Sequence, residues 1–213
     1  MKPVNYLGIA LLSFCFLLGA GAGTVAADPS AESRQPVHYP IWIQNPWTSE
    51  TLLTYVEEPS TELWNGQRIK DYEASLKVES APPLGVLTIS KLNIQTPIYN
   101  GTDEFQLDRG AGRIKGMAKI DEDGNLGISG HRDGFFRGLK DIEVGDDIYV
   151  QTTSGVESYE VSSITIVDKA DFSVLTKSDE KMLTLVTCYP FYFVGHAPKR
   201  YIVKADVKEY SLD

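Results

Sequence analysis

Between Gly85 and Val207 the chain is a succession of short apolar runs that are rich in Val, Ile, Thr and Tyr. Gly, Asp and Ser separate these runs, of which "GVLTIS", "DDIYVQT" and "MLTLVTC" are typical. Runs of this length and composition predict β-strands, and helical spacing is nearly absent apart from short turns at 103–107, 135–139 and 172–175. About seven or eight strands in about 130 residues predict an all-β fold, either a closed barrel or a sandwich.

The N-terminal segment predicts export. After Met1 and Lys2, residues 6–27 run for 22 positions without a charge, which is long enough to cross a hydrocarbon core as a helix. The small residues "VAA" before Asp28 also resemble a signal-peptidase site. Residues 1–27 are therefore either a transmembrane anchor or a cleaved signal peptide. Both interpretations place the rest of the chain outside the cytoplasm, at the cell membrane or secreted.

Three regions follow the export segment. Residues 28–60 are rich in Pro, Ser, Thr and Glu and predict an extracytoplasmic spacer. Residues 61–80 predict a helix that packs on the flank of a domain, and residues 81–213 form that predicted catalytic domain. The flanking helix places four apolar residues near one face at the helical period: Trp64, Ile69, Tyr72 and Leu76.

Composition argues against several classes of function. The chain has 20 basic and 29 acidic residues, a formal charge of -9 and no basic patch, so we expect no nucleic-acid partner. The acidic run at 121–124 lacks the spacing of an EF-hand loop and predicts a turn. Scattered histidines and one exported cysteine do not make a zinc site. We therefore expect no metal and no cofactor.

Cys188 is the only cysteine outside the export segment, and it ends the run "MLTLVTC". A lone thiol in an exported domain is either a buried inert residue or a reactive nucleophile. A nucleophilic thiol needs a basic partner, a donor for the oxyanion and a rigid support. His131 and His196 are the candidate partners. Arg200, twelve residues after Cys188, is the candidate donor if a hairpin brings the two strands together.

The motifs "GHRD", "FFRGLKDIEVGD", "TLVTCYPF" and "APKRYIV", in this order, resemble those of a sortase, most of all the class D group, over residues 82–207. This resemblance implies an eight-stranded sortase-type β-barrel and a cysteine transpeptidase. Carried over onto this chain, it implies that Cys188 is the nucleophile. His131 would be the general acid and then the base, and Arg200 would hold the oxyanion.

The resemblance also implies the substrates. A sortase cleaves a surface protein between Thr and Gly of a sorting signal similar to Leu-Pro-x-Thr-Gly, through a thioacyl intermediate. An amine acceptor, from cell-wall peptide or another protein, then resolves that intermediate. Asp133 is a candidate to orient His131 or Arg132. We expect the substrate groove to include four residues near the catalytic positions: Thr187, Ser129, Tyr189 and His196.

Two other functions stay open on the sequence. One keeps the nucleophile but transfers the acyl group to water, as an exported cysteine hydrolase. The other is a noncatalytic, membrane-anchored β-barrel that binds peptides, for which Cys188 would be dispensable. An L,D-transpeptidase is disfavoured, because the chain lacks "HG" followed by an "S-x-G-C-x-R" run.

Overall fold

The computed structural model describes residues 56–192, 195 and 197–208. The predicted export segment, nearly all of the predicted spacer and His196 lie outside the described residues. Within the described part of the chain, no helix is both long and apolar enough to cross a membrane.

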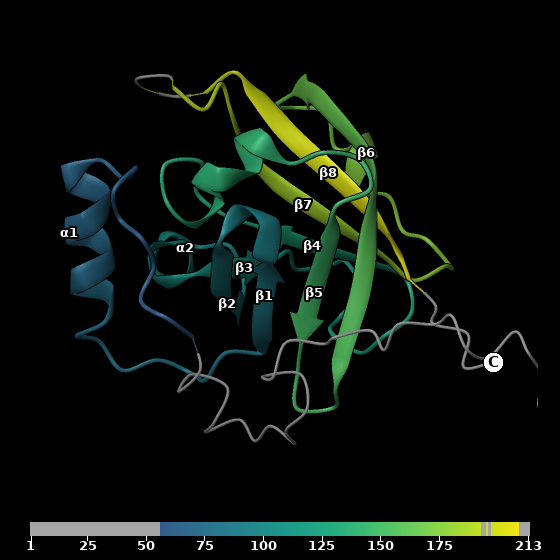
Figure 1. The fold of residues 1–213 in the computed structure, drawn as a ribbon, viewed down its shortest axis with the longest axis horizontal. Coiled ribbons are helices and arrows are strands. Elements are labelled where there is room, and N and C mark those ends of the chain that lie inside the picture. The colour runs from purple at the N-terminus through teal and green to yellow at the C-terminus, as the bar shows by residue number, and fades with distance from the viewer. Residues whose placement is uncertain (1–55, 193–194, 196, 209–213) are drawn as a thin grey trace, which may run out of the picture. The chain divides into compact units, whose positions relative to one another are not determined.

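Eight strands close into a single barrel (Figure 1). Around the barrel their order is β1-β2-β3-β4-β7-β8-β6-β5, and β5 pairs back with β1. The β2–β3 and β4–β7 pairs are parallel, and the other pairs are antiparallel. The predicted all-β barrel is thereby confirmed. The strands are β1 (Gly85–Ile89), β2 (Ile94–Asn100), β3 (Ala111–Arg113), β4 (Asn125–Ser129), β5 (Asp147–Gln151), β6 (Val156–Asp168), β7 (Met182–Tyr189) and β8 (Lys199–Val207).

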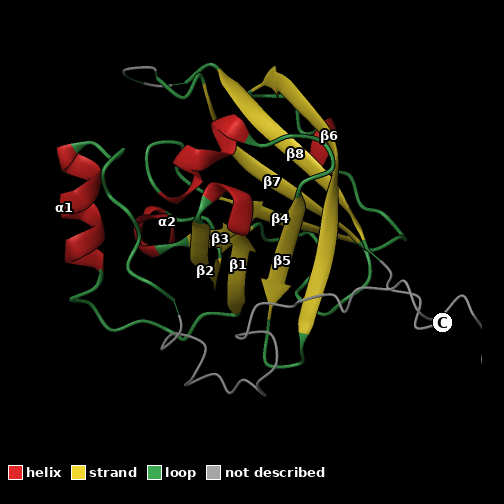
Figure 2. Cartoon of the chain, viewed as in Figure 1, coloured by secondary structure: helices red, strands yellow, loops and turns green. Residues whose placement is uncertain are grey.

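Helical structure is short: α1 precedes the first strand in the sequence, and the other helices lie in the connections between strands (Figure 2). The three turns predicted within the β-rich region are confirmed as α2 and the 3-10 helices η5 and η6. The helices are α1 (Gly66–Ser75), η4 (Ser90–Leu92), α2 (Glu104–Arg109), η5 (Phe135–Asp141) and η6 (Ser173–Leu175).

The flanking helix α1 is shorter than the predicted segment 61–80. It begins at Gly66 because the Asn65 side chain accepts hydrogen bonds from the backbone N–H groups of Gln67 and Arg68. Leu76 follows the last helical residue as the C-cap and is 53 % exposed. The prediction that Trp64 and Leu76 share a helical face with Ile69 and Tyr72 is therefore wrong, because Trp64 precedes the helix and Leu76 follows it.

The barrel interior is filled from alternate positions along the strands. On β7, Leu183 and Leu185 are fully buried, and Val203 on β8 faces the same interior. This alternation follows from the period of two along a strand, which sends successive side chains to opposite faces. The largest fully buried side chains are Tyr159, Phe136, Leu87, Ile89, Ile98, Ile128, Leu139, Ile148, Leu183, Leu185 and Ile202.

An aromatic cluster joins α1 to the barrel. The rings of Trp64, Tyr72 and Phe135 meet edge to face, with centroids 5.0 to 5.7 Å apart. Phe135 begins η5, so the cluster ties the flanking helix to the segment that follows β4. Edge-to-face pairs add specific geometry to the burial of aromatic area. This contact places α1 beside α2 on one flank of the barrel (Figure 1).

The buried position of Leu185 makes a prediction about stability. Replacing Leu185 with Ala removes buried methyl groups from the centre of β7 and should lower the free energy of unfolding by about 2–5 kcal/mol in urea titrations. Ile166 on β6 is 45 % exposed, so Ile166→Ala is the matched control and should cost about 0.5 kcal/mol or less. Equal losses in the two variants would contradict the described core.

Candidate active site

The ends of β7 and β8 bring Cys188 and Arg200 together. In the antiparallel register of these strands, Cys188 pairs directly with Arg200. Directly opposite residues in an antiparallel pair have Cβ atoms about 4.5–5.5 Å apart. The hairpin on which the candidate role of Arg200 depended is therefore present. Both side chains are half-buried.

The end of β4 lies on the other side of β7. The two strands run parallel, and Ser129 at the end of β4 pairs with Val186. His131 and Cys188 each follow two residues beyond this pair. Because parallel neighbours end at the same edge of a sheet and lie about 4.8 Å apart, His131 and Cys188 emerge at one mouth of the barrel.

Two hydrogen bonds continue the β4–β7 contact up to the catalytic candidates. The backbone N–H of Gly130 donates to the Val186 carbonyl over 3.1 Å. The Thr187 hydroxyl then donates to the Gly130 carbonyl over 2.8 Å. Thr187 is 1 % exposed, so its side chain is a buried link between the residue before Cys188 and the residue before His131.

Gly130 has no room for a side chain. A Cβ atom there would lie 2.8 Å from the ring of Phe136, which is fully buried. The chain after His131 folds back on the same ring, because the His131 carbonyl accepts hydrogen bonds from the N–H groups of Gly134 and Phe136 at 3.2 Å. The loop that carries His131 is therefore held from both sides.

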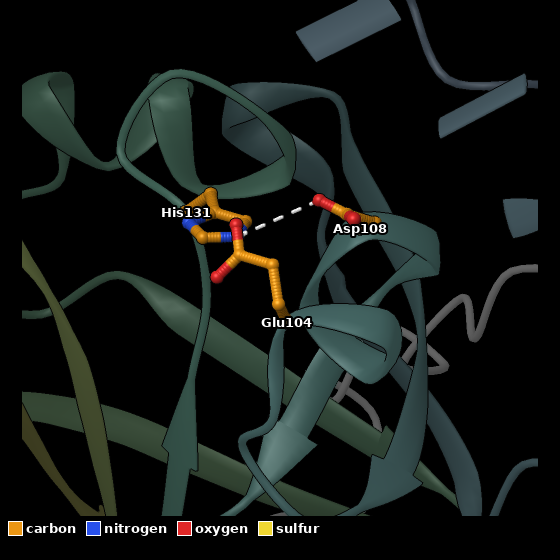
Figure 3. Close-up of side chains that lie close together, drawn as sticks. All are labelled: Glu104, Asp108 and His131. Atoms are coloured by element: carbon orange, nitrogen blue, oxygen red, sulfur yellow. Dashed lines mark ion pairs between the residues drawn. The ribbon is translucent and has the colours of Figure 1, made fainter. Parts of the chain in front are cut away.

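His131 faces two carboxylates on α2 (Figure 3). Its Nε2 lies 3.3 Å from a carboxylate oxygen of Glu104 and 3.8 Å from one of Asp108. The His131 side chain is 18 % exposed. Burial lowers the pKa of His131 below its ordinary value, and the nearby Arg68 guanidinium lowers it further. The negative charges of Asp133, Asp108 and Asp71 act in the opposite direction and raise the pKa of His131.

Asp133 is held by the flanking helix. Its carboxylate accepts a hydrogen bond from Asn65 Nδ2 over 2.8 Å and lies 3.4 Å from Arg68 Nε. The neighbouring Arg132 donates from Nη2 to the Gly195 carbonyl over 3.0 Å. The proposed orientation of His131 or Arg132 by Asp133 stays a prediction, and the contacts described for Asp133 run to α1.

The remaining predicted site residues have distinct placements. Arg200 Nη1 donates to the carbonyls of Ala197 and Lys199 at 3.4 and 3.0 Å, which holds the guanidinium at the start of β8. Ser129 is half-buried at the end of β4. Tyr189 is half-buried, and its ring stacks on that of Tyr201 with centroids 6.1 Å apart.

The sortase domain family matches residues 87–208, more than half of the chain. The chain belongs to the sortase family.

Individual relatives agree with this assignment and with the expected class D resemblance. Sortase D of Bacillus subtilis is 44 % identical over 132 residues, which are 62 % of this chain and 67 % of the relative. A solved sortase D5 transpeptidase of Clostridium perfringens is 27 % identical, with a TM-score of 0.57, and the match covers 75 % of this chain and 97 % of that one. Sortase C1 of Streptococcus agalactiae, at 21 % identity and a TM-score of 0.59, covers 77 % of this sortase and 97 % of its own chain and supports the fold.

Sortases are cysteine transpeptidases, and the described barrel is the domain of such an enzyme. The expectation of a noncatalytic peptide-binding barrel is therefore disfavoured.

Sequence reasoning missed the groups that surround His131. Glu104 and Asp108 share a face of α2 at the i,i+4 spacing, and Arg68 lies on α1. An i,i+4 acidic pair is a common solvated helix face, so nothing local connected it with a histidine in a later loop. Only the folded chain brings these groups together.

The same groups raise the question of a metal ion. Glu104, Asp108 and His131 each offer a ligand atom, and these atoms lie within 4.8 Å of one another. Arg68, however, already places its guanidinium on the Asp108 carboxylate. A metal ion at this position would have to displace Arg68, so the donor set already has its cation in the Arg68 guanidinium and does not fit a metal.

The link between Thr187 and Gly130 is testable. Thr187→Val keeps the shape but removes the hydroxyl, so we expect a loss of about 1–3 kcal/mol in the free energy of unfolding. A misplaced His131 loop should also lower peptide cleavage about tenfold or more. Thr187→Ser retains the hydroxyl and should stay close to the wild type in both assays. If Thr187→Val and Thr187→Ser behave alike, the hydrogen bond has no such role.

Proposed function

We propose that this sortase cleaves a sorting signal similar to Leu-Pro-x-Thr-Gly between Thr and Gly and transfers the surface protein to an amine acceptor. Cys188 is the nucleophile, Arg200 stabilises the oxyanion, and His131 transfers the proton. The observation that carries this proposal is the position of Cys188 on β7, paired with Arg200 on one side and next to the β4 end that leads to His131 on the other.

The first step joins the Cys188 sulfur to the Thr carbonyl carbon. Attack of the thiolate converts the carbonyl to a tetrahedral oxyanion, and the electron pair of the C=O bond moves to oxygen. The planar guanidinium of Arg200 is always charged and offers several N–H donors to that oxygen. Its contacts with the carbonyls of Ala197 and Lys199 keep the group at the start of β8 before substrate arrives.

The second step breaks the Thr–Gly bond. His131, as the imidazolium, gives its proton to the leaving Gly nitrogen, and a thioacyl bond to Cys188 remains. The incoming amine then attacks this thioester, His131 takes back a proton, and the Cys188 thiolate is released. The negative carboxylates of Glu104 and Asp108 stabilise the charged form of His131 against the effect of burial.

The substrate groove would be formed around these three residues. Ser129 and Tyr189 are half-buried at the ends of the two strands that carry the catalytic groups, which supports a role in peptide binding. Thr187 would act on the substrate through the backbone that its hydroxyl holds. The assignment of His196 rests on its place in the sequence between Cys188 and Arg200.

We further propose that the enzyme works at the outer face of the cell membrane, on surface proteins that carry a C-terminal sorting signal. The uncharged segment 6–27 and the polar spacer 28–60 support this location, because they would anchor the barrel and extend it from the bilayer. If residues 1–27 are cleaved, the same domain would be secreted.

The proposed acyl transfer predicts a covalent adduct on Cys188. The full chain, incubated with a Leu-Pro-x-Thr-Gly peptide panel, should gain the mass of the peptide up to Thr, and Cys188→Ala should gain nothing. Added amines should be incorporated into a ligated product, as mass spectrometry can detect. Hydrolysis alone, at every amine concentration, would support the cysteine hydrolase. If no peptide acylates Cys188, the proposed sorting signal is wrong.

The role of Arg200 has its own test. Arg200→Lys keeps the positive charge but loses the planar set of donors, so the rate of acylation should fall about 10²-fold or more. Lys199 is exposed and adjacent on β8, so Lys199→Ala is the matched control and should retain the wild-type rate. Similar rates for Arg200→Lys and Lys199→Ala would remove Arg200 from the reaction.

A further inference from the structure

We propose that Arg68, which precedes the matched sortase domain, is a positioning residue of the active site that holds Asp108 and Asp133 around His131. This inference rests on the proposed role of His131 in proton transfer. It assigns to α1 a part in catalysis, since the family match begins only at residue 87.

The Arg68 side chain links α1 to two other segments. Its Nη1 forms an ion pair and hydrogen bond with Asp108 on α2 and lies 3.9 Å from Glu104 of the same helix. Its Nε lies 3.4 Å from the carboxylate of Asp133, two residues after His131. The Arg68 side chain is only 12 % exposed, so these interactions are screened by water much less than those of surface charges.

The position of Arg68 is fixed by its surroundings. Asn65 caps the first turn of α1 by accepting the N–H of Arg68, while its own amide donates to Asp133. The edge-to-face contacts of Trp64 and Tyr72 with Phe135 hold the same helix against η5. Arg68 is therefore presented to the His131 loop from a helix that is itself attached to that loop.

The network acts on one nitrogen of His131. Glu104 and Asp108 face Nε2, so a proton on Nε2 is the one they attract (Figure 3). With Nε2 oriented in this way, Nδ1 is the nitrogen left to exchange a proton with the substrate amine. A carboxylate that fixes the orientation and tautomer of a catalytic histidine is a general solution to this requirement.

Arg68 also balances the charge around the histidine. Carboxylates of Asp71 on α1, Asp108 on α2 and Asp133 in the loop raise the pKa of His131, whereas Arg68 lowers it. Without the guanidinium, these carboxylates would hold the imidazolium proton more tightly. The guanidinium therefore opposes the carboxylates in setting how readily His131 gives its proton to the leaving amine.

Two substitutions that remove charges of opposite sign test this network. In a Cys188→Ala background, NMR titration of His131 in the full chain should show a higher pKa for Arg68→Gln, because a positive neighbour is lost. Asp108→Asn should show a lower pKa for His131, because a negative neighbour is lost and Arg68 is left unbalanced. The resonance is assigned by its absence in His131→Asn. General damage to the fold would not move this pKa in opposite directions.

The active enzyme supplies the second readout. With Cys188 restored, Arg68→Gln should lower kcat for peptide cleavage about tenfold to a hundredfold while KM stays within about twofold. Arg68→Lys keeps the charge and should leave the pKa of His131 near that of the wild type. Its kcat should still fall, because one ammonium cannot reach both Asp108 and Asp133 as the guanidinium does.

Lys70 provides the matched control. It lies on the same helix, is exposed, and loses the same charge in Lys70→Gln, so both readouts should stay at the wild-type values. The inference is overturned if either the pKa of His131 or kcat in Arg68→Gln equals that in Lys70→Gln. The titration needs no substrate. It therefore tests the network even if no sorting-signal peptide is cleaved, an outcome that would count against the proposed function alone.

Discussion

The position of β7 between β4 and β8 is the constraint on which the site depends. Parallel pairing with β4 and antiparallel pairing with β8 fix both neighbours of β7 at the mouth of the barrel. Cys188 therefore has Arg200 on one side and the loop of His131 on the other. Because β7 is paired on both edges and Leu185 on the same strand is fully buried, the Cys188 thiol is carried by a closely packed and rigid strand.

The surroundings of His131 show how one barrel can serve proton transfer. Burial lowers the pKa of His131 and so disfavours the protonated form that the leaving amine needs. The carboxylates of Glu104 and Asp108 act against burial, and Arg68 in turn limits their effect. The charge on His131 is thus set by groups of both signs, and no single neighbour decides it.

The family domain and the functional unit differ in extent. The family match covers residues 87–208, yet the side chain that pairs with Asp108 and Asp133 comes from α1, before that range. The aromatic contact between α1 and η5 and the cap at Asn65 explain why this helix stays in place. A fragment that begins after α1 would contain every residue of the predicted catalytic trio, together with Glu104 and Asp108, and would lack Arg68, which pairs with Asp108 and Asp133.

The sequence by itself determined the local elements and the order of the motifs. Short apolar runs rich in Val, Ile, Thr and Tyr predicted the strands, and three short turns were found where spacing placed them, because both patterns are local properties of the chain. The motifs around His131, Cys188 and Arg200 identified the family. Tertiary structure alone decided the parallel pairing of β4 with β7 and the approach of Arg68 to Asp133 in the loop of His131. Such contacts depend on how the barrel closes, and no periodicity within a segment reports which distant charge will face it.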